Sequence, residues 1–284
     1  MDEATLKSWI GRSETHTDHT TEAPLWRLAA LLDYARPPWT AGEVPPLGHW
    51  MNFLPQYPQS EIDHDGHAKR GGFLPPIPLP RRMWAGSRLS FANPIRVGTD
   101  IERRSEIIDI TAKNGASGQL VVVKVRHVIS SGGVPAVTEE HDIIYRDAPA
   151  KTSAPSVAAA PKEEKKPPSS AIICSITPDI VRLFRFSALT FNGHRIHYDR
   201  DYAREEGYPG LVVHGPLIAV LLMDHFYRHR PKVRVTEFNV RFQSPLFDIH
   251  PFDLCLEETD GGADLRAFNK DGKTCATATL AYAR

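Results

Sequence analysis

Apolar residues in the first 146 positions follow two successive patterns. Between residues 20 and 34, leucines recur three or four positions apart behind a threonine pair that can cap a helix, so an amphipathic helix is predicted there. A short helix is also predicted within residues 1–10. Residues 36–80 are rich in proline, glycine and histidine with little periodicity, and we expect this irregular segment to line a site.

From residue 88 onward, polar and apolar residues alternate with the period of a β-strand. Strands are predicted at residues 88–91, 100–110, 118–129 and 136–145, joined by glycine-bearing turns. Together they predict an antiparallel sheet.

Residues 147–170 contain many prolines and alanines, a charged run and no aromatic residue, which is the composition of a linker. We therefore divide the chain into an N-terminal domain of residues 1–146, a linker of residues 147–170 and a C-terminal domain of residues 171–284.

The C-terminal domain repeats the order of helix and sheet. A strand at residues 171–176 precedes a helix start at Thr177, with Pro178 in its first turn. Residues 211–229 are apolar over most of a helical surface, which predicts a buried helix. Four strands follow, at residues 233–242, 252–258, 263–269 and 273–282.

The two halves share a pattern that indicates an internal repeat. Each has an aromatic residue at a strand end, a nearby proline, an apolar residue and then a long strand, and each finishes with a hairpin around a glycine turn. In the first half the irregular segment takes the place of the long helix. The matching pairs are Phe91 with Phe242, Pro94 with Pro245, and Ile95 with Leu246.

Composition excludes several classes of protein. The 34 basic and 34 acidic side chains balance, so no basic surface for nucleic acid or an anionic membrane is expected. No apolar run approaches the roughly 20 residues of a membrane span, and the N-terminus lacks the pattern of a signal peptide, so we expect a cytoplasmic protein. Its three cysteines, Cys174, Cys255 and Cys275, are expected to be reduced and buried.

Residues 188–215 concentrate the groups that can carry out chemistry. Asn192, His194 and His197 lie within six residues, and a turn of His214 and Gly215 follows at the start of the predicted buried helix. The runs HTDH (16–19) and HDGH (64–67) have histidine spacings seen in metal sites, but without cysteines or a regular scaffold we expect no metal there. The chain has no P-loop, dinucleotide fingerprint or G-x-S-x-G elbow.

The run TFNGHRIH (190–197) resembles the hydratase-2, or MaoC-like, motif S-G-D-x-N-P-x-H, and GLVVHGPL (210–217) resembles the family's V-H-G turn. With the upstream run PPIPLPRRMWAGSRLSF, the chain is most similar to type 2 hydroxyacyl-thioester dehydratases and mesaconyl- or itaconyl-CoA hydratases. The resemblance implies an α+β fold: a double hot-dog, with antiparallel sheets around a central helix that is degenerate in the N-terminal half.

This resemblance also implies roles for the motif residues. His197 falls on the family's catalytic histidine and is expected to take a proton from water, while the N–H of Gly215, together with that of His214, holds the thioester oxygen. Asn192 stands where the family has its catalytic aspartate, and an amide is no base, so we expect it to orient water or substrate. His194, in the motif's asparagine position, and Asp199 are further candidates for catalysis.

A dicarboxylic acyl group and the phosphates of coenzyme A (CoA) require cations, and arginine suits both. We expect no cofactor other than the CoA of the substrate. Trp50 is a second candidate for lining the acyl pocket. The expected substrate-binding residues are Arg81, Arg82, Trp84, Arg195, His214 and Arg241.

The predicted function is reversible hydration of an enoyl-CoA, with itaconyl-CoA or mesaconyl-C4-CoA giving citramalyl-CoA. Three alternatives stay open: a 3-hydroxyacyl-ACP or -CoA dehydratase of fatty-acid metabolism, a thioesterase, and a non-catalytic acyl-CoA-binding protein. Two hot-dog domains in one chain allow a monomer, and analogy with the family suggests a homodimer.

Overall fold

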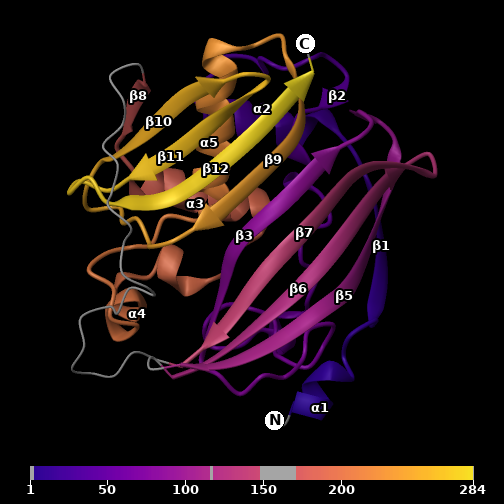
Figure 1. Cartoon of the computed structure of the whole chain (residues 1–284), viewed down its shortest axis with the longest axis vertical. Helices are drawn as coiled ribbons and strands as arrows, with labels where there is room; N and C mark the ends of the chain where they lie inside the picture. The colour runs from indigo at the N-terminus through magenta and orange to yellow at the C-terminus, as the bar shows by residue number, and fades with distance from the viewer. Residues whose placement is uncertain (1–2, 116–117, 148–170, 284) are drawn as a thin grey trace.

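A computed structural model describes residues 3–115, 118–147 and 171–283 of the chain. Its centre is one ten-stranded antiparallel sheet with the order β1-β5-β6-β7-β3-β9-β12-β11-β10-β8 (Figure 1). The strands of the first half are β1 (Ser13–His19), β3 (Arg81–Phe91), β5 (Asp100–Gly115), β6 (Gly118–Ser131) and β7 (Val134–Arg146). Those of the second half are β8 (Ile172–Ile176), β9 (Arg234–Phe242), β10 (Phe252–Thr259), β11 (Gly262–Phe268) and β12 (Thr274–Ala283).

The order of strands is the same in the two halves when each is followed from the edge of the sheet to its centre. It is β1-β5-β6-β7-β3 on one side and β8-β10-β11-β12-β9 on the other. The halves meet where β3 pairs with β9, with Leu89 opposite Phe238. The internal repeat predicted from the sequence therefore appears as a repeat of topology, and its two aromatic-proline strands form the central pair.

Helix α5 (Gly215–His229) is the long buried helix of the second half. It packs against β10, β11 and β12, and the side chains from Leu217 to Phe226 are all buried. In Figure 1 it lies behind these strands, near α2 (Glu22–Leu31) and α3 (Ile180–Thr190). The shorter elements are α1 (Glu3–Lys7), α4 (Arg200–Glu205), β2 (Glu43–Val44), β4 (Ile95–Arg96), η1 (Gly48–Met51), η2 (Gln59–Glu61) and η3 (Arg195–His197).

Within the described residues, the first half has no counterpart of α5 between α2 and β3. The irregular segment occupies this part of the chain, as the sequence predicted. Its apolar end, including Ile77 and Leu79, packs with Leu6 of α1 on β5, β6 and β7. Leu47 and Met51, earlier in the segment, join the main core that spans both halves.

Several predicted boundaries were wrong. Helix α3 begins at Ile180 and is capped by Asp179, whose carboxylate accepts a hydrogen bond from the Arg182 backbone at 2.9 Å, so Thr177 is not the cap. Helix α5 starts at Gly215 because residues 211–213 are extended, with the Val213 N–H donating to the Leu246 carbonyl at 2.8 Å. Strand β1 was not predicted.

The domain boundary at residues 147–170 stays a prediction, because residues 148–170 lie outside the described residues. Cys255 and Cys275 are buried as expected, whereas Cys174 is partly exposed.

Candidate active site

The turn after α3 positions the predicted motif. Phe191 ends the helix in the left-handed region (φ 49°, ψ 37°), and the Asn192 N–H donates to the Ser187 carbonyl at 2.8 Å. The Asn192 side-chain oxygen then accepts the His194 backbone N–H at 2.9 Å, which closes an Asx turn. Asn192 thus shapes the backbone of the motif, and its amide cannot act as a base.

His197 is buried, with 7% of its surface exposed. Its Nδ1 lies 2.7 Å from the Val212 carbonyl oxygen. A carbonyl oxygen only accepts hydrogen bonds, so Nδ1 carries the ring proton and Nε2 has a free lone pair. Burial, with a smaller contribution from His194, lowers the pKa of His197 to about 3 and keeps the ring neutral. This is the protonation state that a proton acceptor requires.

His214 lies directly against His197. The two rings stack with centroids 3.6 Å apart and planes 19° from parallel. His214 is fully buried, and its Nε2 is 2.8 Å from the Ser187 hydroxyl. Burial, with His197 second, holds the pKa of His214 well below its usual range. His214 therefore fixes the orientation of His197 through ring packing, and Ser187 fixes that of His214.

Gly215 is the first residue of α5, where backbone N–H groups have no partner within the helix. Its N–H has no acceptor among the described residues, and the following Pro216 has no N–H to offer. A Cβ atom at position 215 would lie 3.3 Å from Trp84 and 3.4 Å from Phe242. A free N–H donor at the positive end of a helix, beside two aromatic rings, is suited to holding a developing oxyanion.

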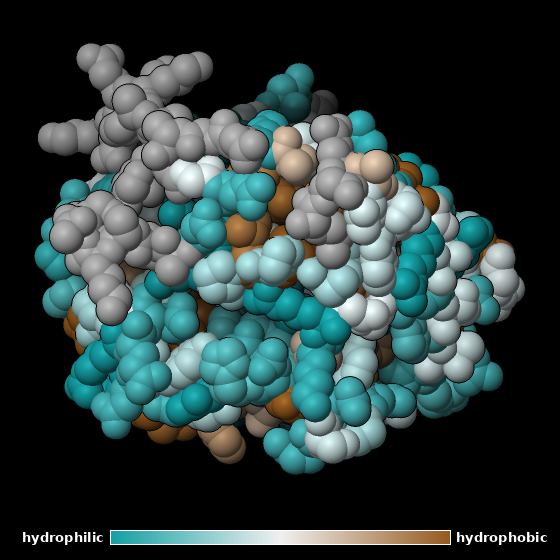
Figure 2. Space-filling model, turned by 90° about the horizontal axis from the view of Figure 1, so that it is seen from below, coloured by the Kyte–Doolittle hydropathy of each residue, from teal (hydrophilic) through white to brown (hydrophobic). Residues whose placement is uncertain are grey.

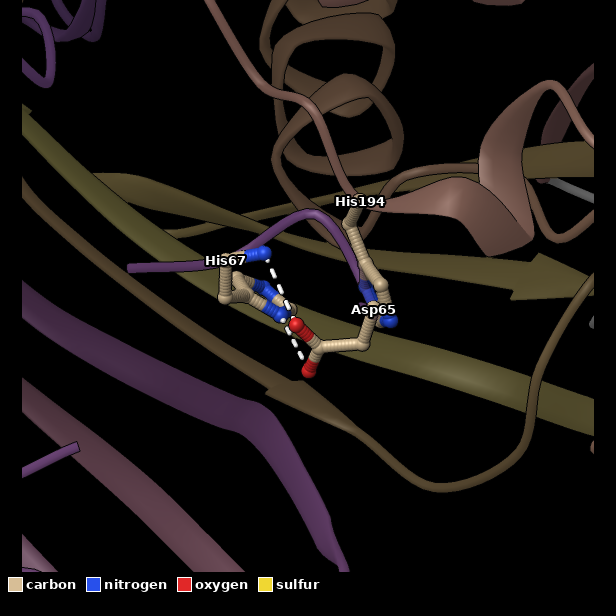
Figure 3. Close-up of side chains that lie close together, drawn as sticks. All are labelled: Asp65, His67 and His194. Carbon is tan, nitrogen blue, oxygen red and sulfur yellow. Dashed lines mark hydrogen bonds and ion pairs between the residues drawn. The ribbon is translucent and has the colours of Figure 1, made fainter. Parts of the chain in front are cut away.

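A third group reaches the site from the irregular segment of the first half. Asp65 accepts from the His67 backbone N–H at 2.8 Å and contacts His67 Nδ1 at 3.0 Å (Figure 3). The His67 ring lies 4.1 Å from that of His194, which is itself 5.4 Å from His197. The site therefore contains a row of four imidazoles, His67, His194, His197 and His214, with one carboxylate at its end.

The loop that carries Asp65 is docked onto the motif through the backbone. The Arg195 N–H donates to the Asp65 carbonyl at 2.9 Å. Gly66, at φ +89°, lies so close to the chain that an added Cβ atom would be 1.8 Å from the Gly193 carbonyl oxygen. Glycine at both positions permits this approach between segments that are far apart in the sequence.

Trp84 and Arg82 enter the site from β3. They are two residues apart on one face of the strand, with Arg82 opposite the fully buried Tyr145 and Trp84 opposite Ile143. Burial and then His67 lower the pKa of His194 to about 3, and the positive charge of Arg82 makes a smaller contribution in the same direction. Arg82 therefore lies near the row of imidazoles.

The other predicted arginines have different surroundings. Arg81 pairs with Glu206 at 3.4 Å, and Arg195 pairs with Asp199 at 2.7 Å, whereas Arg82 has no carboxylate partner among the described residues. Arg241 is exposed on the outer face of β9. Asp199 also caps α4. Its carboxylate therefore pairs with Arg195 and accepts hydrogen bonds from the first backbone N–H groups of that helix.

A buried polar group lies behind Trp84. The Glu139 carboxylate accepts from Trp50 Nε1 at 3.0 Å, lies 3.2 Å from His49 Nε2, and also bonds to His141. The rings of Trp50 and His141 are each 5.4 Å from Trp84. We refer to Glu139, His49, Trp50 and His141 as the Glu139 cluster.

A cavity of about 310 Å³ lies away from the row of imidazoles. It lies by Tyr227, near the C-terminal end of α5, while Gly215 starts that helix. His49 lines the cavity and belongs to the Glu139 cluster, which continues through Trp84 to Gly215. Aromatic and polar side chains thus separate the cavity from the predicted acyl site.

The end of the molecule that carries α1 and α4 in Figure 1 has a mainly hydrophilic surface with scattered apolar residues (Figure 2). No helix in the described parts of the chain is long and apolar enough to span a membrane.

The fold is shared with solved structures of double hot-dog proteins, among them MaoC-like dehydratases. A mycobacterial protein with a double hotdog fold matches 96% of both chains (12% identity, TM-score 0.59). A MaoC-like dehydratase from Phytophthora capsici matches 100% of this chain and 98% of its own (14% identity, TM-score 0.69), and HtdX from Mycobacterium tuberculosis matches 93% and 98% (18% identity, TM-score 0.66). The predicted double hot-dog fold is confirmed.

The family follows from sequence similarity. The family described as hydroxyacyl-thioester dehydratase type 2 matches residues 47–248. A mesaconyl-C(4)-CoA hydratase from Chloroflexus aurantiacus is 46% identical over 282 residues, covering 99% of both chains. A mitochondrial hydroxyacyl-thioester dehydratase type 2 from Schizosaccharomyces pombe is 26% identical, covering 85% of this chain and 89% of its own. This chain belongs to the hydroxyacyl-thioester dehydratase type 2 family and is a hydro-lyase.

Sequence reasoning missed three residues that complete this site. Asp65 and His67 were noticed only as a metal-like spacing, although the glycine between them is a signal of a close backbone approach. Ser187 gave no signal, because nothing in the sequence pairs it with His214.

Proposed function

We propose that this enzyme adds water to the CoA thioester of an unsaturated branched C5 dicarboxylic acid, mesaconyl-C4-CoA or itaconyl-CoA, to form citramalyl-CoA. The similarity to mesaconyl-C(4)-CoA hydratase across nearly the full length of both chains supports this substrate class. The main structural support for this chemistry is the free Nε2 of His197. The ring of His197 is held by the Val212 carbonyl and stacks on His214, just before the start of α5.

The reaction follows from these groups. For mesaconyl-C4-CoA, water donates a proton to His197 Nε2 while its oxygen bonds to the β-carbon, and the electron pair of the double bond moves toward the thioester oxygen. The N–H of Gly215 stabilises the negative charge on that oxygen. The imidazolium of His197 then returns the proton to the α-carbon, so water has been added across the double bond.

The free carboxylate of the acyl group needs a cation inside the site. Arg82 is the predicted arginine that faces inward and has no carboxylate partner among the described residues. The Glu139 cluster and Trp84 close the space behind Gly215, which favours a short acyl group over a long one. A fatty-acid dehydratase would instead need an open apolar path from Gly215.

We further propose that the reaction uses no cofactor beyond the CoA of its substrate, since every step is a proton transfer or an addition of water. A cytoplasmic location and a homodimer are also proposed. Size-exclusion chromatography with light scattering tests the homodimer, and a single peak at about 32 kDa would contradict it.

The test of function compares mesaconyl-C4-CoA with crotonyl-CoA by loss of absorbance of the conjugated thioester, and follows itaconyl-CoA by mass spectrometry of citramalyl-CoA. We expect preference for the C5 dicarboxylyl substrates and no turnover by His197→Ala. Preference for crotonyl-CoA would support the fatty-acid alternative. Release of free thiol would support a thioesterase, and tight binding without turnover a non-catalytic protein.

A further inference from the structure

The motif after α3 provides one imidazole for water but no carboxylate. The oxygen of Asn192 already accepts the backbone N–H of His194, and its amide cannot take a proton. A water that attacks carbon is best oriented when both of its hydrogens have acceptors, which leaves its lone pair directed at the carbon. His197 supplies one of these acceptors, so the site needs a second.

Asp65 and His67 have the arrangement of a carboxylate that orients an imidazole. The Asp65 carboxylate lies 3.0 Å from Nδ1 of His67 and also accepts the backbone N–H of that residue. Because the carboxylate accepts the Nδ1 proton, Nε2 of His67 carries a lone pair. Although burial opposes it, bonding to His67 lowers the pKa of Asp65, which stays ionised.

The position of this pair connects it to the motif. Asp65 is held through its carbonyl by the Arg195 N–H, and Gly66 contacts Gly193. The ring of His194 has its centroid 4.1 Å from that of His67 and 5.4 Å from that of His197, so it neighbours both imidazoles. The pair is therefore built against the residues that precede His197, on the turn that Asn192 shapes.

The same three side chains, Asp65, His67 and His194, place possible metal ligands within 4.8 Å of one another. Positive charge nearby disfavours a cation. Burial lowers the pKa of His67 most, the bond to Asp65 opposes this shift, and the charges of Arg82 and Arg70 lower the pKa further. The surroundings therefore favour neutral imidazoles and an anionic substrate.

We propose that His67, oriented by Asp65, is the second water-binding group of the site and supplies the acceptor that the motif lacks at Asn192. This inference rests on the proposed hydration reaction. The attacking water gives one hydrogen to Nε2 of His197, which takes it as a proton and returns it to the α-carbon. The other hydrogen bonds to Nε2 of His67 and stays on the product hydroxyl. Asp65 is a positioning residue, which holds the tautomer of His67.

The test uses the full-length enzyme and mesaconyl-C4-CoA. We expect His67→Phe, which retains a ring, to lower kcat by about 100-fold or more while changing KM little, because the lost contact is to water. Asp65→Asn can still accept the His67 backbone N–H but allows the other tautomer, so its kcat should lie between those of wild type and His67→Phe. His64→Phe, the matched control, removes an exposed histidine of the same loop whose Nδ1 lies 3.0 Å from Asp63, and it should retain most of the activity.

Three results would overturn the inference. Near wild-type kcat in folded His67→Phe would show that this imidazole does not hold the water, and a larger loss in His194→Phe would assign the role to His194. A stoichiometric divalent metal in the purified enzyme, lost together with activity in Asp65→Asn, would make the cluster a metal site. In all three cases the wild type still hydrates the substrate; absence of hydration by the wild type would instead refute the proposed function.

Folding and site integrity are checked separately. Circular dichroism should give the same spectrum for all variants, and the affinity for the product citramalyl-CoA should change less than threefold in Asp65→Asn. A parallel fall in affinity and kcat would mean that Asp65 only maintains the pocket, and would contradict its role in orienting His67.

Discussion

A Cβ atom on Gly66 would lie 1.8 Å from the carbonyl oxygen of Gly193. This approach joins the irregular segment of the first half to the predicted catalytic motif of the second. Because Gly66 also has φ +89°, replacement by alanine has two costs: an unfavourable backbone conformation and displacement of the loop.

We expect Gly66→Ala to lower kcat by about 100-fold, the effect of moving a site by roughly 1 Å. Gly98→Ala is the matched control, because Gly98 has a similar φ of +81° and no atom within 4 Å of its added Cβ. Both variants should lose stability in thermal melts, Gly66→Ala the more of the two, and only Gly66→Ala should lose activity. Equal activity in the two would show that the contact with Gly193 has no catalytic role.

The buried histidines predict a loss of stability in mild acid. His194 and His197 each have a pKa of about 3, lowered chiefly by burial, against about 6.5 in an unfolded chain. Between these values the unfolded state binds more protons than the folded state, so stability rises with pH. Their contribution is complete above about pH 6.5 and is lost as the pH falls toward 3.

We therefore expect the Tm to fall steadily from pH 7 to pH 4.5, a window in which carboxylates of lowered pKa such as Asp65 still keep their charge. His197→Asn should show a shallower fall, because one site of proton uptake is gone. Differential scanning calorimetry at fixed ionic strength measures both slopes. A Tm that is constant across this window would mean that the histidines are not buried as neutral groups.

Arg82 should decide the preference for a dicarboxylic acyl group. A charge-assisted bond to a carboxylate contributes about 1.5–3 kcal/mol, so Arg82→Met should lower the ratio of kcat/KM for mesaconyl-C4-CoA over crotonyl-CoA by about 10- to 100-fold. Arg241→Met serves as the control, since Arg241 is exposed on the outer face of β9 and should leave the ratio unchanged. A larger effect in Arg241→Met would place the acyl carboxylate elsewhere.

The sequence predicted the parts of this molecule that depend on local pattern. Alternation located most strands, the repeat anticipated matching halves, and the motif indicated His197 and Gly215 as candidate site residues, whose roles stay a prediction. Prediction from the sequence failed for features that depend on a contact between distant segments of the chain. The glycine beside Asp65 signals a close backbone approach, but nothing in the sequence identifies Gly193, about 130 residues away, as its partner. Likewise, His49 and Trp50, two of the partners of Glu139, lie about 90 residues from it. Such contacts are fixed by tertiary packing.

Helix ends show the same limit on a smaller scale. Thr177 and Asp179 are both good capping residues, and only the structure shows which side chain accepts the first free N–H. Likewise, residues 211–213 are apolar enough for a helix but are extended because they pair with the chain near Leu246.

The Glu139 cluster should contribute strongly to stability. Glu139 is 2% exposed, and although burial opposes ionisation, His141 and His49 hold its pKa well below the usual range. Glu139→Ala leaves these buried partners without their acceptor, so the free energy of unfolding should fall by about 3–5 kcal/mol. Glu140→Ala, which breaks a partly exposed pair with Arg88, should cost about 1 kcal/mol or less. Urea titration compares them, and similar losses would contradict a buried ionised carboxylate.

Trp84 should limit the length of the acyl group, because it lies between Gly215 and the Glu139 cluster. Replacing it with leucine keeps the surface apolar but removes about half of the side chain, which opens space beyond the acyl site. Each additional methylene that can be buried contributes about 1 kcal/mol or more. We therefore expect Trp84→Leu to raise kcat/KM for trans-2-octenoyl-CoA relative to crotonyl-CoA by at least about tenfold. Trp39→Leu, which removes a ring from the lining of the cavity at the other end of α5, should leave this ratio unchanged. The same gain in both variants would mean that the far cavity already receives the acyl chain, and that Trp84 does not separate it from the site.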